Sequence, residues 1–76
     1  MEKVNIELSK NEALVLFEFL ARFNESDHPN LFEDQAEQRI MWNLEAILET
    51  KLIEPFYENY LEIIQQARAQ VRDSKE

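Results

Sequence analysis

The apolar residues of this chain are concentrated between residues 13 and 23, in the run Ala-Leu-Val-Leu-Phe-Glu-Phe-Leu-Ala-Arg-Phe. When these residues are placed at about 100° per residue, as in an α-helix, one face is apolar along its length. That face, which we predict to be buried, comprises Ala13, Leu16, Phe17 and Leu20. Val15 and Phe19 lie outside it, one turn apart. A helix that is apolar on several sides is covered by more than one neighbour, so Val15 and Phe19 indicate a second contact surface.

The start of this helix is indicated by Ser9 and Glu12, which have the spacing of a capping box. In that motif the serine hydroxyl accepts a hydrogen bond from the backbone N–H of the glutamate, whose side chain accepts from the serine N–H. Asn24 is the first stop signal in a chain that contains no glycine. We therefore predict a first helix over residues 10–24, followed by a polar turn that reaches residue 30.

A second helix over residues 31–53 is predicted because Asn30 and Glu33 repeat the cap spacing. Its apolar stripe, expected to face the first helix, comprises Ala36, Ile40, Met41, Leu44, Ile47 and Leu48, and Leu52 extends it. Trp42 lies on the far face. Because tryptophan is enriched at interface cores, Trp42 is a candidate contact residue; the alternative is that it covers neighbouring aliphatic side chains or lies under the amino-terminal segment.

A third helix is predicted over residues 55–72, since Pro55 suits a first helical position and cannot continue the preceding helix. A start at Asn59 is the alternative, because Asn59 and Glu62 again have cap spacing. Apolar residues then recur at alternating intervals of three and four, as in a heptad seam. This seam comprises Tyr57, Tyr60, Ile64, Ala67 and Val71. Two heptads are too few for an independent coiled coil, so we expect the seam to pack against the other helices.

Residues 3–8 alternate between polar and apolar, with Val4, Ile6 and Leu8 on one side, which is the pattern of a half-buried strand. No second strand-like run is present for it to pair with. The segment either lies as extended chain across the helices or pairs antiparallel with its copy in a second subunit, and pairing satisfies more backbone groups.

The predicted fold is therefore a single all-α domain over residues 1–76, a three-helix bundle with a short amino-terminal extended or β segment at 3–8. A chain of 76 residues without cysteine has no disulfide to stabilise its small core, which leaves oligomerisation as the usual route. We expect a homodimer whose interface comprises Val4, Ile6, Leu8, Val15, Phe19 and Trp42. The start of the chain does not resemble a signal peptide, and no run approaches the roughly 20 apolar residues of a transmembrane helix, so we expect a cytoplasmic protein.

The formal net charge of −8 argues against direct binding to nucleic acid or to an anionic membrane surface, because both would need clustered Lys and Arg. It suits a basic partner protein. An acidic face for such a partner would comprise Glu33, Asp34, Glu37, Glu45 and Glu49. The chain could thus act as an inhibitor or antidote, like an immunity protein or an antitoxin, on a basic nuclease, toxin or nucleic-acid-binding protein.

Candidate catalytic and metal-binding groups are few. His28 is the only histidine, which excludes a multi-histidine metal site within one chain. The acids near it, Glu33, Asp34 and Glu37, are explained by their place at the start of a helix, where negative charge is favoured. The absence of glycine excludes a phosphate-binding glycine loop. We expect no metal, no cofactor and no enzymatic activity.

Residues 7–23, followed by 32–39 and 42–45, resemble a set of small bacterial proteins that have no assigned activity. The resemblance covers most of the chain; it implies a bacterial cytoplasmic origin and no catalytic residue. In size and acidity the chain is also loosely similar to nuclease-inhibiting immunity proteins, without a shared motif. The function we expect is a non-enzymatic protein–protein interaction or regulatory module, with the acidic inhibitor as the alternative.

Overall fold

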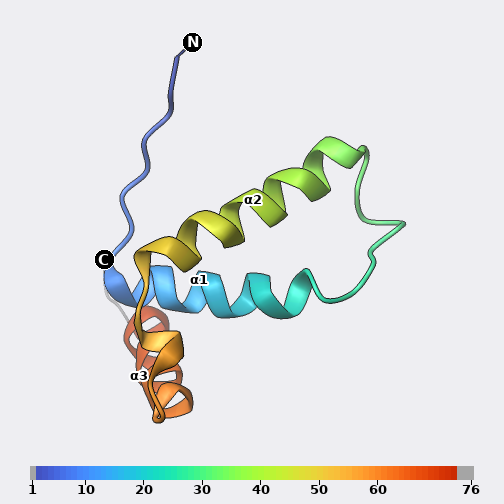
Figure 1. Ribbon diagram of the computed structural model, residues 1–76. Helices are drawn as coiled ribbons and strands as arrows, with labels where there is room; N and C mark the ends of the chain where they lie inside the picture. Colours follow the sequence, from blue (N-terminus) through green and yellow to red (C-terminus); the bar gives the residue numbers. More distant parts are fainter. Residues whose placement is uncertain (1, 74–76) are drawn as a thin grey trace.

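The computed structural model describes residues 2–73, which form three α-helices and one short 3₁₀ helix. They are α1 (Lys10–Phe23), α2 (Gln35–Lys51), η1 (Glu54–Phe56) and α3 (Tyr60–Arg72). The predicted all-α class is confirmed, and the described residues contain no strand. The chain turns after α1 so that α2 runs back beside it, and α3 then lies across the first half of α1 (Figure 1). Over residues 2–73 no helix combines the length and apolar character needed to cross a membrane.

The core lies where α3 meets the hairpin formed by α1 and α2. Its buried side chains come from all three helices and from Leu52, which directly follows α2: Leu14, Phe17, Leu20, Leu48, Leu52, Ile64 and Ala67. Leu16 and Met41 are among the partly buried residues that pack against this core. Because α1 contacts both α2 and α3, it is the central element of the bundle.

The buried face of α1 differs from the predicted one. Phe17 and Leu20 are buried as expected, but Leu14 is also buried, whereas Ala13 and Leu16 are only partly covered. The reason is that α1 is covered by two helices on different sides, so its buried arc is centred on Phe17 and extends to Leu14 and to Leu20. The apolar pattern of residues 13–23 predicts a narrower buried arc that extends to one side of Phe17 only.

The predicted start of the second helix, residue 31, is wrong. Asn30 lies in a turn, and the helix begins at Gln35 after Asp34, whose carboxylate accepts a hydrogen bond from the Ala36 N–H at 2.7 Å. The backbone N–H of Glu33 donates to Glu37 Oε1 at 3.0 Å, which satisfies a further group at this helix end. The helix ends at Lys51 rather than residue 53. The true cap has the same chemistry as the predicted one but lies four residues later.

The predicted stripe of α2 is too wide, because one of its flanks is exposed along the helix. Leu48 and Leu52 are buried, and Leu44 is partly buried, but Ile40 and Ile47 are 57% and 55% exposed, respectively. Ala36 is exposed as well. At 100° per residue the three exposed side chains lie about 80–120° to one side of Leu48, so they lie on a flank of α2 that does not face α1.

The third helix begins at Tyr60, next to the alternative start at Asn59, and the predicted helix over residues 55–72 is too long. Pro55 instead forms part of η1, after which the chain turns before α3. Ile64 and Ala67 of the predicted seam are buried and Tyr60 is partly buried. Tyr57 and Val71, the two ends of that seam, are exposed, because η1 and the last turn of α3 extend past α1.

The corrected cap of α2 can be tested by comparing two substitutions. Asp34→Ala should lower the free energy of unfolding by about 1 kcal/mol, because the Ala36 N–H loses its only acceptor at the helix start. Asn30→Ala is the matched control and should change it by less than about 0.5 kcal/mol, since Asn30 is an exposed turn residue. Urea unfolding followed by circular dichroism measures both. An equal loss in the two variants would contradict a helix start at Gln35.

Candidate interaction surfaces

Residues 2–9, which we call the amino-terminal arm, form neither helix nor strand and lead away from the helices (Figure 1). Val4 is 89% exposed and Ile6 is 79% exposed, while Leu8, next to α1, is exposed to a smaller extent. Ser9 ends the arm with the predicted capping box, in which its hydroxyl accepts from the Glu12 N–H at 3.0 Å. The arm therefore presents apolar side chains that the body of the same chain does not cover.

Val15 and Phe19 lie in an open groove between α1 and α3, of about 320 Å³, which we call the α1–α3 groove. Its lining comprises Glu12, Val15, Leu16, Phe19, Arg22, Arg68 and Val71. Phe19 is exposed and its ring stacks on Phe23, with 5.7 Å between the ring centroids. Of the surplus apolar flank expected from the sequence, Phe19 is exposed as predicted, whereas Val15 is half-buried and packs against the core. Val71 of α3 adds to the exposed part.

The charges around the α1–α3 groove are arranged about Glu18. Its Oε2 accepts hydrogen bonds from Arg22 Nε and from Arg68 Nη2, each at 2.9 Å, and the second of these links α1 to α3. The guanidinium carbon of Arg22 lies 5.7 Å from the centroid of the Phe19 ring, within the range of a cation–π contact. The two arginines thus share one carboxylate, and Glu12 also lines the groove, so its positive and negative charges balance.

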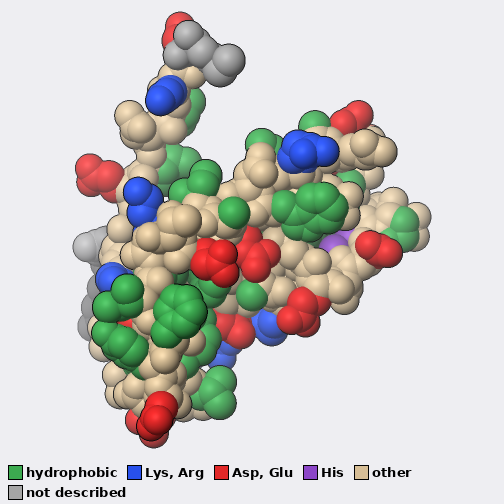
Figure 2. Space-filling model, in the orientation of Figure 1, with side chains coloured by type: hydrophobic (Ala, Val, Ile, Leu, Met, Phe, Trp, Pro, Cys, Tyr) green, Lys and Arg blue, Asp and Glu red, His purple; other side chains and the backbone are tan. Residues whose placement is uncertain are grey.

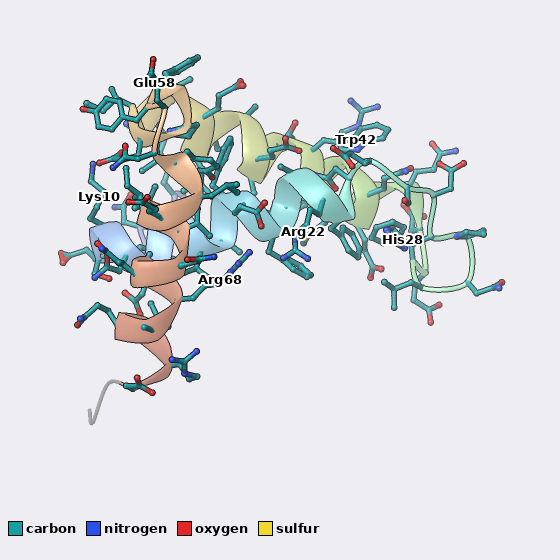
Figure 3. The ribbon with its side chains drawn as sticks, turned by 90° about the horizontal axis from the view of Figure 1, so that it is seen from below. Lys10, Arg22, His28, Trp42, Glu58 and Arg68 are labelled. Carbon is teal, nitrogen blue, oxygen red and sulfur yellow. The ribbon has the colours of Figure 1, made fainter. Side chains whose placement is uncertain are left out.

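Trp42 does not belong to the same surface. It is exposed on α2, on the other side of the hairpin from Arg22 and Arg68 (Figure 3). The six residues predicted to form one interface thus occupy three places: the arm, the α1–α3 groove and the outer flank of α2.

The five predicted acidic residues are likewise distributed along α2. Asp34 and Glu37 accept backbone hydrogen bonds at the start of the helix, beside Glu33. Glu45 is partly buried and accepts a hydrogen bond from Asn24 Nδ2 at 2.7 Å, while Glu49 is exposed. The structure therefore presents three carboxylates at the amino end of α2 and two along its flank, rather than one continuous face.

A cluster of aromatic rings at the far end of the hairpin was missed by sequence reasoning. The rings of Phe23 and His28 are stacked with their centroids 4.0 Å apart, and the Phe32 ring meets Phe23 edge-on at 5.9 Å. His28 Nε2 lies 2.7 Å from the Phe23 carbonyl oxygen. The available signal was the pair Leu31 and Phe32, two large apolar residues directly after a polar turn.

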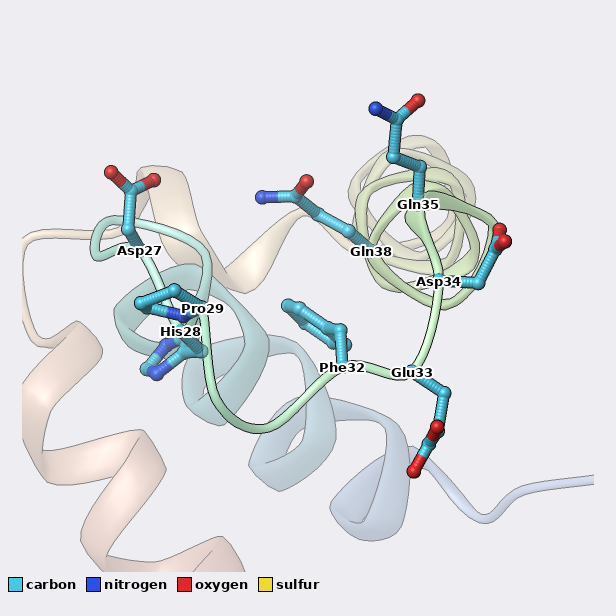
Figure 4. A pocket seen from close by; sticks show the side chains of 8 residues that line it. All are labelled: Asp27, His28, Pro29, Phe32, Glu33, Asp34, Gln35 and Gln38. Carbon is cyan, nitrogen blue, oxygen red and sulfur yellow. The ribbon is translucent and has the colours of Figure 1, made fainter.

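Two open depressions adjoin Phe32. The more polar one, of about 380 Å³, is lined by Asp27, His28, Pro29, Phe32, Glu33, Asp34, Gln35 and Gln38, and the carboxylates of Glu33 and Asp34 point away from its centre (Figure 4). Glu25 and His28 have the Glu-x-x-His spacing of di-metal bundles, but they lie in a loop. Among residues 2–73 no three His, Asp or Glu side chains are grouped so that they could hold a metal ion.

The second depression, of about 490 Å³, is apolar except at one residue, and we call it the hairpin groove. Its lining comprises Phe23, Leu31, Phe32, Glu37, Ile40 and Met41. The residues come from the end of α1, from the connection and from the first half of α2. It is the apolar surface that remains where α3 does not reach.

A further exposed apolar patch surrounds η1, where α2 leads into α3 (Figure 2). It comprises Ile53, Phe56, Tyr57 and Leu61, of which Phe56 is 82% exposed. Beside it, Lys10 Nζ lies 3.1 Å from Glu54 Oε2 and ties the start of α1 to η1. The predicted packing of Tyr57 against the other helices is therefore wrong, and the exposure of Phe56 was not predicted.

Two ionisable groups have clearly altered acidity. Hydrogen bonding from its own backbone N–H and from the Lys10 ammonium holds the pKa of the Glu54 carboxyl below its usual value of 4.5. Burial, together with the charge of Glu18, raises the pKa of the Tyr60 phenol above its usual value of 10. The Tyr60 hydroxyl is buried and has no hydrogen-bond partner among the described residues. Both shifts move the pKa away from neutrality, so neither prepares a general acid or base.

Comparisons of this chain with protein-family models, with curated proteins and with solved structures give no significant match.

The link between Glu54 and Lys10 predicts a specific pH dependence. Because the folded-state pKa of Glu54 lies below 4.5, its carboxylate stabilises the fold fully above that pH, and the contribution is lost as the pH falls through the folded-state pKa. Glu54→Gln should therefore lower the free energy of unfolding at neutral pH by up to about 1 kcal/mol, and its difference from the wild type should vanish as the pH falls through the folded-state pKa. Urea titrations over this range measure the difference, with exposed Glu58→Gln as the control. A difference that persisted at the lowest pH would contradict this assignment.

Proposed function

We propose that this chain is a non-enzymatic protein–protein interaction module that acts as a homodimer in the cytoplasm. The observation that carries the proposal is the exposure of Val4 and Ile6 on the amino-terminal arm, at 89% and 79%. Burying a Val or Ile side chain stabilises a structure by roughly 1.5–3 kcal/mol. The isolated chain does not gain this stabilisation, because both side chains remain in water. A second copy of the chain offers the same arm and the same α1–α3 groove.

The size of the core supports association. Seven side chains are buried within the described residues, and a core of this size gives a net stability of only about 3–5 kcal/mol. Additional apolar burial between two copies would add to that stability. Monomeric proteins of this size rarely leave several large apolar side chains exposed close together. Both facts favour a dimer over an isolated bundle.

The proposed interface follows two-fold symmetry. The arms of two copies pair antiparallel, so that the backbone groups of residues 3–8 find partners and Val4, Ile6 and Leu8 face the same side. The apolar side of the paired arms then packs over Val15 and Phe19. Trp42 lies on another flank and is assigned to a separate contact.

Removing the apolar side chains of the arm should dissociate the dimer without unfolding it. The double variant Val4→Ser, Ile6→Ser should remain helical by circular dichroism, because both side chains are exposed on an arm that leads away from the helices (Figure 1). Its dissociation constant should rise by about 30-fold or more, as expected for the loss of about 2 kcal/mol of apolar burial. Analytical ultracentrifugation from low to high micromolar concentration measures both proteins. A wild-type chain that stays monomeric throughout would refute the proposed dimer.

A matched pair of substitutions locates the helical part of the interface. Phe19→Glu should dissociate the dimer while leaving the monomer folded, whereas Phe56→Glu, on the patch around η1, should leave it intact. Both residues are exposed, so neither change disrupts the core. The opposite result would move the interface to the η1 patch.

A second function, inhibition of a basic protein, is favoured by the distribution of charge. Residues 23–50 hold seven acidic side chains and one basic one, Arg39, so most of the net charge of −8 lies there. A basic nuclease or toxin purified from the source organism should lose activity when this chain is added and recover it at high salt. The double variant Glu45→Gln, Glu49→Gln should slow its association by about threefold, since complementary charge acts mainly on the encounter rate. Inhibition that was unaffected by salt would argue against this function.

A further inference from the structure

The hairpin groove combines an apolar floor with an unneutralised acidic surrounding. We infer that it binds a basic amphipathic segment of a partner protein, with one large apolar side chain of the partner in the groove and its Lys or Arg residues toward the carboxylates around it. The inference rests on the proposed role as a protein-interaction module, and it adds the site and the chemistry of the partner. It does not require the homodimer.

The groove is bounded by side chains whose positions are fixed by the fold. Phe23 forms part of its wall and is held by the ring of His28 at 4.0 Å and by the edge of Phe32 at 5.9 Å. The hydrogen bond between His28 Nε2 and the Phe23 carbonyl oxygen links the loop between α1 and α2 to the end of α1. Asn24, directly after α1, donates from Nδ2 to the carbonyl oxygen of Met41 on α2 at 3.2 Å. A partner therefore meets a preformed surface and loses less entropy on binding.

Two of the groove's apolar residues remain largely in water. Leu31 is 62% exposed and Ile40 is 57% exposed, although both line the groove. At the opposite end of the hairpin, α3 packs against α1, and Leu48 and Leu52 belong to the buried core there. A helical segment bound in the groove would supply at the far end the third layer that α3 supplies at the near end.

The charge of this region determines what kind of segment fits. Residues 23–50 carry a net charge of −6, and none of their seven carboxylates forms an ion pair within residues 2–73. Glu37 lines the groove itself, and Glu33 and Asp34 directly precede α2. A second copy of this acidic region would be repelled, as would a nucleic acid or an anionic membrane. A segment that carries Lys and Arg beside a large apolar side chain complements both the carboxylates around the groove and its apolar floor.

The test uses fluorescence anisotropy with a short labelled peptide of Leu and Lys, in which Leu recurs at intervals of three and four residues. The controls are a peptide of the same composition with the Leu positions scrambled and a peptide in which Glu replaces Lys. Ile40→Gln should weaken binding of the amphipathic peptide by about tenfold, or about 1.4 kcal/mol. Ile47→Gln is the matched control, since Ile47 is 55% exposed on the same helix but does not line the groove, and it should change binding by less than about twofold.

A second matched pair separates charge from apolar contact. Glu37→Gln keeps an oxygen that can accept from the Glu33 N–H, so the helix cap is preserved while one charge is lost. It should weaken binding by about threefold and reduce the salt dependence, whereas Glu49→Gln, outside the groove, should have a smaller effect. Equal effects of Ile40→Gln and Ile47→Gln, or equal binding of the scrambled peptide, would overturn the site and leave only non-specific attraction between opposite charges. Absence of binding would overturn it as well.

Sedimentation of the same samples distinguishes this inference from the proposed dimer. A monomeric wild type that binds the peptide through Ile40 would refute the dimer and uphold the groove. A dimeric wild type that does not bind the peptide would uphold the dimer and refute the groove.

Discussion

The structure depends on the packing of α3 across α1, beside the end of α2. Within residues 2–73 every buried side chain comes from these three helices except Leu52, which directly follows α2. Leu20 and Ile64, which are the largest side chains with almost no exposure, belong to α1 and α3. The link from Arg68 to Glu18 closes the same junction at the surface. Since a surface ion pair adds little, the apolar contact provides the stability.

A consequence of this arrangement is that the two ends of the molecule differ. The end near α3 has three layers and nearly balanced charge, with ion pairs at Lys10 and Arg68. The far end has two layers and holds most of the net negative charge. In a chain this short, one crossing helix cannot cover a hairpin along its whole length. Exposed apolar residues such as Ile40 therefore follow from the architecture, and they are the surfaces on which a function through binding would act.

The sequence predicted the fold class, the first helix and its capping box, because each follows from local patterns. It placed α2 four residues too early, since Asn30 and Asp34 carry the same capping chemistry and only the path of the chain distinguishes them. It could not predict that Ile40 is exposed while Leu48 is buried, because both lie on one apolar stripe and only the packing of α2 determines which part of that stripe is covered. The exposure of Phe19 was predicted, as it follows from the polar neighbours Glu18 and Arg22. The hairpin groove was missed because the connection was treated only as a turn.

The connection between α1 and α2 has a further consequence, which concerns the length of loops. The chain has no glycine, and none of residues 2–73 has a positive φ angle, so α1 ends without the left-handed residue that closes many helices tightly. The link to α2 instead takes residues 24–34, and it contributes Leu31 and Phe32 to the wall of the hairpin groove. Surface loops of proteins usually vary freely in length. In this molecule a loop shortened by the loss of Leu31 and Phe32 would also lose part of the wall of the hairpin groove. The length of this loop therefore affects a surface as well as the connection between two helices.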